Sequence, residues 1–285
     1  MRRKIRGYWD RFKHLTLKVP RFNVRETDCF LCSYPRSGNT WMRHMIAAAV
    51  RPESKGDFSQ LEAFFPTLNR NGLAEKLRGM EGRPYRLFKS HEPFLPHYLK
   101  GKVAYLIRDG RDVMVSYHHY SDALCRKPIE LSQFVRDCVD ERRQRSSWSA
   151  HVRGWMAHMA HPNVLIVRYH DMLEDAEREL RRVLAHFQIE AEEHAIREAV
   201  EASQVGHINK VFEQSATLRD KSFDGGLGGG GGKGKQLMDA ATMAYFMADA
   251  EGLLRELGYL DAAPPAAPGH DAPRASPAAA TAAVR

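Results

Sequence analysis

Four short apolar runs recur along the chain, and each is followed by a polar segment and then by a helical pattern. The runs cover residues 29–34, 85–89, 103–107 and 164–168, and their length and their branched and aromatic side chains predict buried strands. Apolar positions at helical spacing predict helices over 39–50, from 111 onward, and over 130–145, 148–160, 172–187, 192–204 and 239–257. Strands alternating with helices predict an α/β fold, a single domain with a central parallel sheet flanked by helices.

The ends of the chain and one internal segment depart from this pattern. Residues 1–27 are densely basic and predict an N-terminal arm or a solvated helix, whereas the folded pattern covers 28–260. Eight of the ten residues from Gly225 to Gly234 are glycine, which predicts a loop because glycine disfavours helix and strand interiors. Residues 261–285 are rich in alanine and proline and predict a disordered tail.

The charge of the chain indicates an anionic partner. The net charge is +8 over 285 residues, which suits nucleotide phosphates, nucleic acid, an acidic substrate or a membrane surface and does not choose among them. No apolar run approaches the roughly 20 residues of a membrane span, and the basic N-terminus lacks the apolar core of a signal peptide. We therefore expect a cytoplasmic protein. We expect no nucleic-acid partner. Peripheral membrane contact through the basic arm and a homodimer both stay open.

The four cysteines predict core packing rather than chemistry. They are Cys29, Cys32, Cys125 and Cys138, too few for a disulfide scaffold. Cys29 and Cys32 form a C-x-x-C within a predicted strand, where residues three apart point to opposite faces. No second C-x-x-C or histidine pair completes a zinc site, so no metal is expected.

Polar residues follow each predicted strand, at 35–40, 90–93, 108–112 and 169–171. In open α/β sheets, ligands bind beyond the carboxyl ends of the strands. These four segments are therefore expected to converge on one cleft.

The segment after the first strand has the composition of an anion site. Gly38 allows a tight turn, and the backbone N–H groups at the start of the next helix point at a ligand. Ser37 and Thr40 add hydroxyl donors, and Arg36 adds a planar cation suited to phosphate or sulfate oxygens. An ordinary N-capped helix would explain Asn39 or Thr40, but not Arg36 and Gly38 beside them.

A nucleotide-dependent kinase or NTPase is the alternative reading of a phosphate loop. Its signature is G-x-x-x-x-G-K-[ST], and the segment 34–41 lacks the lysine and the spacing. The glycine tract satisfies G-x-x-x-x-G-K up to Lys235, but Gln236 then stands where a magnesium-binding hydroxyl belongs.

Four segments together resemble the PAPS-dependent sulfotransferase family of cytosolic and bacterial type, PAPS being 3′-phosphoadenosine 5′-phosphosulfate. Residues 34–41, Y-P-R-S-G-N-T-W, match the opening motif of that family, and 89–91 match its K-[ST]-H segment. Residues 108–117 match its R-[DN]-x-[KR]-D-V-x-x-S run, and 169–172 match Y-x-D-[ML]. The resemblance implies a P-loop-like nucleotide-binding fold and metal-free transfer of a sulfuryl group from PAPS. The acceptor would be a hydroxyl of a glycan, a glycolipid or a small natural product or alcohol, with an amine as the less favoured choice.

The resemblance also implies catalytic roles. His91 would be the general base that takes the proton of the acceptor hydroxyl. Arg36 and Lys89 would stabilise charge on the transferring group and on the leaving phosphate. His118 and His119 follow Ser116 on one predicted helix and stay open as alternative bases.

The resemblance further implies a set of donor-binding residues. The 5′-phosphosulfate would contact 36–40, the 3′-phosphate would contact Arg108 and Ser116, and the adenine would lie near Tyr169 and Trp41. An ion pair of Arg108 with Asp112 or Asp171, and core packing of Tyr169, stay open as structural alternatives. The complete predicted set is Arg36, Ser37, Gly38, Asn39, Thr40, Trp41, Arg108, Ser116, Tyr169, Lys233 and Lys235.

One segment departs from the family pattern. Family members often carry an Arg-Lys-Gly cluster near the C-terminal end that closes over the 3′-phosphate. Here the corresponding stretch begins at Phe223 and Asp224 and continues into the glycine tract. Lys233 and Lys235 are the residues that could replace the missing arginine.

Overall fold

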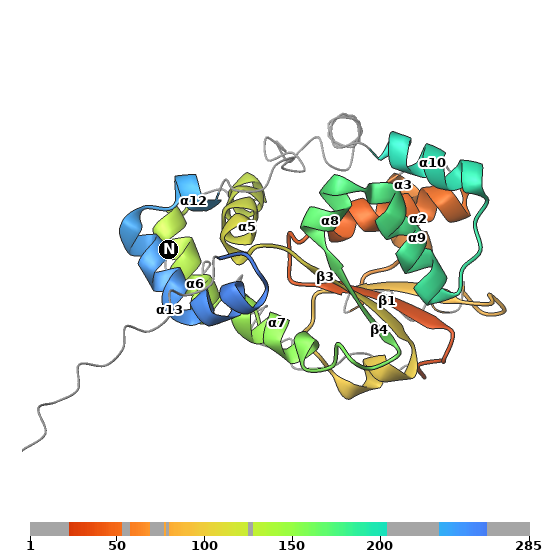
Figure 1. The fold of residues 1–285 in the computed structure, drawn as a ribbon, viewed down its shortest axis with the longest axis horizontal. Helices are drawn as coiled ribbons and strands as arrows, with labels where there is room; N and C mark the ends of the chain where they lie inside the picture. The colour runs from red at the N-terminus through yellow and green to blue at the C-terminus, as the bar shows by residue number, and fades with distance from the viewer. Residues whose placement is uncertain are drawn as a thin grey trace, which may run out of the picture.

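The computed structural model describes residues 23–52, 58–68, 77, 80–124, 128–203 and 234–260. Its sheet consists of β1 (Asp28–Ser33), β2 (Arg86–Ser90), β3 (Lys102–Ile107) and β4 (Val164–Arg168). All neighbouring pairs are parallel, in the order β2-β1-β3-β4 (Figure 1). The predicted α/β fold with a parallel sheet is confirmed, and each strand lies within one residue of its predicted bounds.

Helices cover the sheet and extend beyond one end of it (Figure 1). In the described ranges, no helix has both the length and the apolar character needed to cross a membrane. The helices are α2 (Asn39–Val50), α3 (Phe58–Phe64), α5 (Gly110–Leu124), α6 (Leu131–Val139), α7 (Trp148–Met156), α8 (Tyr169–Glu174), α9 (Ala176–Phe187), α10 (Glu193–Ala202), α12 (Gly234–Leu237) and α13 (Ala240–Glu256), with a 3₁₀ helix at Pro96–Lys100.

Three predicted helices are wrong in their extent. The helix predicted over 130–145 ends at Val139, and the one predicted over 148–160 ends at Met156. The segment predicted as a single helix over 172–187 forms two helices, α8 and α9, which are separated at Asp175. The Asp175 carboxylate accepts a hydrogen bond of 2.8 Å from the backbone N–H of Arg178. An N-cap of this kind satisfies the first turn of a new helix, and it competes with continuation of the preceding one.

Three predicted segments fall outside the described residues. They are most of the basic arm (1–22), the glycine tract up to residue 233, and the tail at 261–285. Cys125 and Lys233 also lie outside, and Gly234 is the first residue of α12.

The two faces of the sheet carry separate apolar clusters. Cys29 and Leu31 of β1 pack with α2, α8, α9 and α10, whereas Phe30 and Cys32 pack on the opposite face. This alternation follows from the two-residue period of a strand. It confirms that Cys29 and Cys32 point to opposite faces, and burial raises the pKa of Cys29 to about 12.

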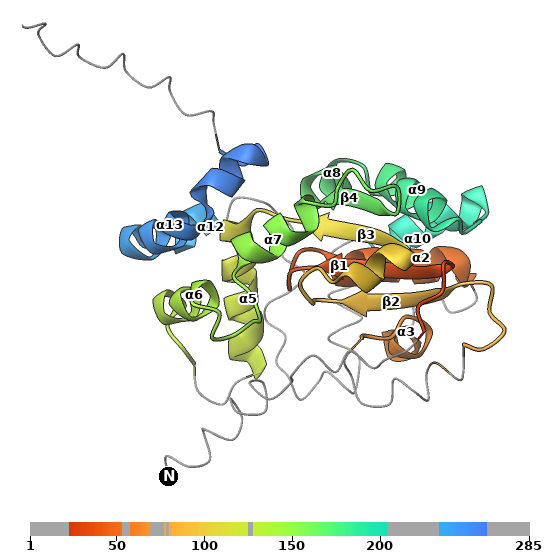
Figure 2. The ribbon, with the colours of Figure 1, turned by 90° about the horizontal axis from the view of Figure 1, so that it is seen from below.

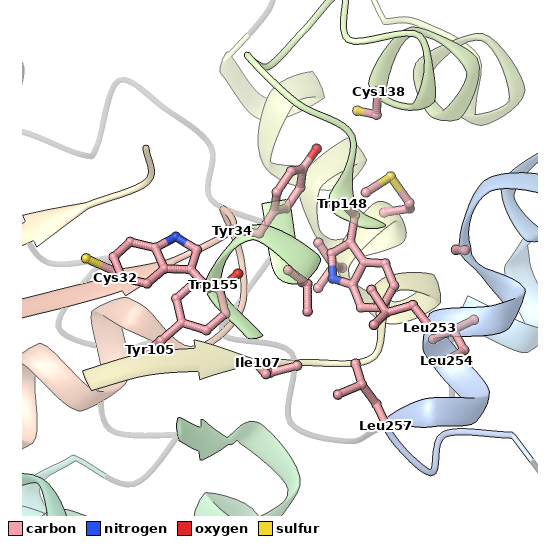
Figure 3. Close-up of a cluster of buried hydrophobic side chains, with 14 of the residues drawn as sticks. Cys32, Tyr34, Tyr105, Ile107, Cys138, Trp148, Trp155, Leu253, Leu254 and Leu257 are labelled. Carbon is pink, nitrogen blue, oxygen red and sulfur yellow. The ribbon is translucent and has the colours of Figure 1, made fainter. Parts of the chain in front are cut away.

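The apolar cluster that contains Phe30 and Cys32 continues past the carboxyl ends of the strands. Figure 2 shows α5, α6, α12 and α13 at that end of the sheet. Trp148 and Trp155 of α7 are fully buried there. Figure 3 shows the Trp148 ring next to Leu253, Leu254 and Leu257 from the α13 end of the chain. The helices at this end of the sheet are thus joined to it by one continuous core.

The order of the strands defines where a ligand would bind. From β1 the chain moves to the edge at β2 and then returns across β1 to β3. The direction of winding therefore reverses between β1 and β3, and open α/β sheets bind ligands at such a switch point. The 34–38 turn follows β1, and Arg108 follows β3 directly.

A buried ion pair holds β1 against β2 at the start of both strands. Arg86 donates from Nε and from a terminal nitrogen to the two carboxylate oxygens of Asp28, both at 2.6 Å. The side-chain exposures are 6% for Arg86 and 0% for Asp28. Such a pair is far more sensitive to the loss of one partner than a surface pair is.

We expect Arg86→Leu to lower the free energy of unfolding by about 3–5 kcal/mol, because it leaves the Asp28 carboxylate buried without its cation. Denaturant unfolding measures this change. Arg181→Leu is the matched control, since Arg181 contacts Glu177 at 2.5 Å on a partly exposed helix face. The loss of this surface cation should cost much less stability than the loss of Arg86, because water screens the pair. Equal losses for the two variants would contradict the prediction.

Candidate functional site

The turn between β1 and α2 has two residues in the left-handed backbone region. Arg36 has φ 68° and Gly38 has φ 98°. A Cβ atom at Gly38 would lie 2.7 Å from Cδ2 of Tyr169, which is closer than such atoms approach one another. Gly38 is therefore required both by its φ angle and by its contact with the Tyr169 ring.

Several buried polar atoms at this turn lack a hydrogen-bond partner among the described residues, and two of them are donors beside the proposed anion site. Neither the Ser37 hydroxyl nor Nε of Arg108 forms a hydrogen bond within the described residues. Ser37 is only 1% exposed, and buried polar groups are otherwise nearly always paired. Asn39 fixes the turn beside them by donating to the Leu31 carbonyl at 3.0 Å. The unpaired donors suit an anionic ligand in the turn.

Two arginines meet at the switch point. Arg36 Nε donates to the Ser116 hydroxyl at 3.2 Å, and Arg108 donates to the Arg36 carbonyl at 3.2 Å. Burial first, and then the charge of Arg108, lowers the pKa of Arg36 to about 10. Two adjacent cations in a partly buried site favour a ligand with more than one negative charge.

Aromatic rings support both arginines. The Arg108 guanidinium lies 4.3 Å from the centre of the Tyr169 ring, and Arg36 lies 4.8 Å from the centre of the Tyr120 ring. Trp41 packs edge-on against Tyr169, with 5.9 Å between ring centres. The contacts of Arg108 in the described part of the chain thus include the Arg36 carbonyl and the Tyr169 ring, whereas its alternative ion pairs with Asp112 or Asp171 stay predictions.

His91 lies directly beside the turn. Its Nδ1 is 2.8 Å from the Ser33 carbonyl oxygen and 3.3 Å from the Ser33 hydroxyl. Burial, followed by the charge of Lys89, lowers the pKa of His91 well below its usual value. The neutral ring donates from Nδ1, because a carbonyl oxygen only accepts, and this leaves the lone pair of Nε2 available to act as a base.

Lys89 lies on β2, two residues before His91, and pairs in register with Leu31 of β1. Its backbone N–H donates to Pro66 and its carbonyl accepts from Leu68, both at 2.8 Å. These bonds fix the strand on its open side. Lys235 lies in α12, but its side chain and Lys233 fall outside the described part of the chain.

The alternative bases are placed less well for that role. His118 Nε2 donates to the Ile129 carbonyl at 2.6 Å and lies 3.2 Å from the Asp122 carboxylate. His119 is exposed on the same helix. Of these histidines, His91 is the one bonded to the residue that precedes the 34–38 turn.

Several contacts at the site were not predicted from the sequence. Tyr120 lies beneath Arg36, Ser33 accepts from His91, and His151 contacts the backbone of His91. These residues come from different elements, and only the packing of the fold brings them together. Tyr120 alone had a local signal, since it lies one helical turn after Ser116.

Comparison with known proteins gives one family and one fold. The sulfotransferase domain model matches residues 26–227. Human sulfotransferase 2B1 is 32% identical over 172 residues, which cover 56% of this chain and 46% of that protein. Sulfotransferase 2A2 of Rattus norvegicus is 31% identical over 192 residues, covering 62% and 65%. The chain thus spans about half to two thirds of the length of these curated relatives.

Solved structures share the fold at low identity. Retinol dehydratase in a complex with retinol and PAP has a TM-score of 0.66 and 20% identity, covering 84% of each chain. A mouse sulfotransferase complexed with PAP has a TM-score of 0.64 and 18% identity, covering 85% of this chain and 91% of that one. At these identities the likeness supports the fold alone.

We expect Gly38→Ala to destabilise the protein by about 2–4 kcal/mol, the sum of left-handed backbone strain and overpacking against Tyr169. Gly82→Ala is the matched control, because Gly82 also has a positive φ but has no atom within 4 Å of the added Cβ. Strain alone should cost it about 1–2 kcal/mol. Chemical denaturation measures both variants, and an equal cost would show that the Tyr169 contact does not matter.

Proposed function

The chain belongs to the sulfotransferase domain family, and on that premise we propose that it transfers a sulfuryl group from PAPS to a hydroxyl group of a small acceptor. The observation that carries the proposal is the double role of Ser33. It accepts a hydrogen bond from His91 at 2.8 Å, and it directly precedes the turn that carries Arg36, Ser37 and Gly38. Ser33 thus positions both the proposed base and the proposed anion-binding turn.

The residues at the switch point fit a sulfated nucleotide with two separate anionic groups. In the proposal, the 34–38 turn and the first N–H groups of α2 bind the 5′-phosphosulfate, with Ser37 and Thr40 as hydroxyl donors. Arg108 and Ser116 bind the 3′-phosphate, and Trp41 and Tyr169 lie against the adenine. Bound PAPS supplies the sulfuryl group. The unpaired Ser37 hydroxyl and Arg108 Nε support this assignment, because both are buried donors that need an acceptor.

The proposed base is Nε2 of His91. Its Nδ1–H is held by the Ser33 carbonyl, so Nε2 can accept the proton of the acceptor hydroxyl as that oxygen attacks. Lys89 and Arg36 stabilise the charge that develops on the sulfuryl and leaving phosphate oxygens. Sulfuryl transfer resembles phosphoryl transfer, in which positioning and charge stabilisation supply most of the catalysis.

The names of the relatives favour a small molecule over a glycan as the acceptor. A 3-alpha-hydroxysteroid sulfotransferase of Cavia porcellus is 29% identical over 174 residues. An amine sulfotransferase of Oryctolagus cuniculus is 29% identical over 180 residues. We propose a hydroxyl-bearing small molecule as the acceptor class, and a hydroxysteroid, a phenol and an amine form the first panel for a transfer assay with labelled PAPS.

Adenosine 3′,5′-bisphosphate at about 100 times its dissociation constant should stabilise the protein by about 2.7 kcal/mol, or roughly 5 °C in melting temperature. Thermal unfolding with and without the ligand measures this. ATP with magnesium should give a much smaller shift, because the turn lacks the lysine and hydroxyl of a triphosphate loop. Arg108→Ala should remove most of the bisphosphate shift. A magnesium-dependent ATP shift without any bisphosphate shift would favour the kinase alternative.

His91→Ala should lower kcat by about 10²–10⁴-fold, the usual contribution of a positioned base, while the affinity for the bisphosphate is retained. In the unaltered protein, kcat/KM should hold from neutral pH to below 6.5, because the lowered pKa of His91 keeps Nε2 unprotonated there. Activity should then fall with further acidification. His194→Ala, on an exposed face of α10, is the control. Full activity of His91→Ala would exclude the proposed base.

A further inference from the structure

A second buried histidine contacts the backbone of the proposed base. His151, on α7, is 1% exposed, and its Nε2 lies 3.3 Å from the His91 carbonyl oxygen. Its Nδ1 lies 2.8 Å from the Tyr105 hydroxyl on β3. We propose that His151 is a positioning residue that fixes the orientation of His91 by donating to its carbonyl, with Tyr105 holding His151 in the donating tautomer. This inference rests on the proposed function of His91.

The protonation states of this chain of contacts agree with that role. Burial lowers the pKa of His151 to about 4, so the ring is neutral near pH 7 and carries one N–H. Burial raises the pKa of Tyr105 well above its usual value, so its hydroxyl keeps its proton. Since the His91 carbonyl only accepts, His151 donates from Nε2 and accepts the Tyr105 O–H at Nδ1.

This chain of contacts cannot carry the catalytic proton. His151 contacts a carbonyl oxygen of His91 and not its ring, and a carbonyl oxygen has no proton to pass on. His151 is also buried in an aromatic cluster, with Tyr34 edge-on at 5.5 Å. Its influence on the reaction is therefore through the position of His91.

The helix α7 contacts the backbone carbonyls of two consecutive residues after β2, His91 and Glu92. His151 and Trp155 are one helical turn apart, and Trp155 Nε1 donates to the Glu92 carbonyl at 3.4 Å. The Glu92 N–H in turn donates to the Ser90 hydroxyl at 3.1 Å. The backbone around His91 is thus fixed by α7, while its ring is fixed by β1. Two independent anchors leave the ring little freedom to turn away from an acceptor.

Two substitutions separate the two hydrogen bonds of His151. The amide of His151→Asn can reach the position of Nδ1 and bond to Tyr105, but it is too short to reach the His91 carbonyl. The longer His151→Gln can place an N–H near the position of Nε2 and restore that bond. Both residues are polar, which limits the cost of burying them.

NMR of protein labelled with ¹⁵N-histidine tests the inference without any acceptor. His91 should give the signals of one tautomer, protonated at Nδ1, in the unaltered protein and in His151→Gln. His151→Asn should shift or average these signals. His186→Asn is the control, because His186 lies at a comparable 3.3 Å from the Asn163 carbonyl, far along the chain from the site.

Kinetics with PAPS and a hydroxysteroid or phenol provide the second test. His151→Asn should lower kcat by about 10–100-fold, because a displacement of about 1 Å can cost up to about 100-fold, with little change in the dissociation constant of the bisphosphate. His151→Gln should recover most of that loss. In a His91→Ala background, His151→Asn should cause no further loss, because it acts only through His91.

The outcomes distinguish this inference from the proposed function. His151→Asn could keep the kcat and the His91 signals of the unaltered protein while His91→Ala loses activity as expected. That result would leave the proposed base standing and overturn the role of His151. An equal loss in His151→Asn and His151→Gln, or a further loss in the His91→Ala background, would indicate a general structural role and overturn it too. Full activity of His91→Ala would overturn the proposed base itself.

Discussion

The site depends on the close contact between the Gly38 backbone and the Tyr169 ring. A side chain at Gly38 would meet that ring at 2.7 Å, so the turn after β1 can lie against the end of β4 only with glycine there. The same ring lies 4.3 Å from the Arg108 guanidinium and 5.9 Å from the Trp41 ring. One aromatic side chain thereby fixes the shape of the turn, the place of a cation and the wall beside it. The turn after β1 thereby contacts the residue after β4, although β3 lies between these two strands in the sheet.

Ser33 complements this contact on the other side of the turn. Its carbonyl and hydroxyl face His91 at 2.8 and 3.3 Å, and the hydroxyl also accepts from Asn39 at 3.3 Å. The end of β1 therefore sets the distance between the proposed base and the first turn of α2. Because β1 lies inside the sheet and its ion pair with β2 is buried, this distance is fixed by the rigid part of the fold.

The sequence was informative wherever one local stretch determined the structure. Strand positions, α2 and the turn at Gly38 followed from apolar runs, turn residues and a contiguous motif, and residues 28–33 form β1 within one position of the prediction. The break at Asp175 was missed because apolar spacing continues through it, whereas its cap depends on one side chain. The contacts of His151 and Tyr105 were unpredictable for another reason. They join residues 46 and 60 positions apart along the chain, and no local pattern marks either partner.

The electrostatics of the site link donor binding to the strength of the base. After burial itself, the charge of Lys89 is the largest cause that lowers the pKa of His91, and the cation pair of Arg36 and Arg108 lies at the same turn. An anion bound there offsets positive charge near the imidazole, which favours its protonated form and raises its pKa. Under the proposed function, His91 would therefore be a stronger base with the donor in place than without it. The anionic donor would then do more than supply the sulfuryl group, because its charge would raise the basicity of the residue that activates the acceptor.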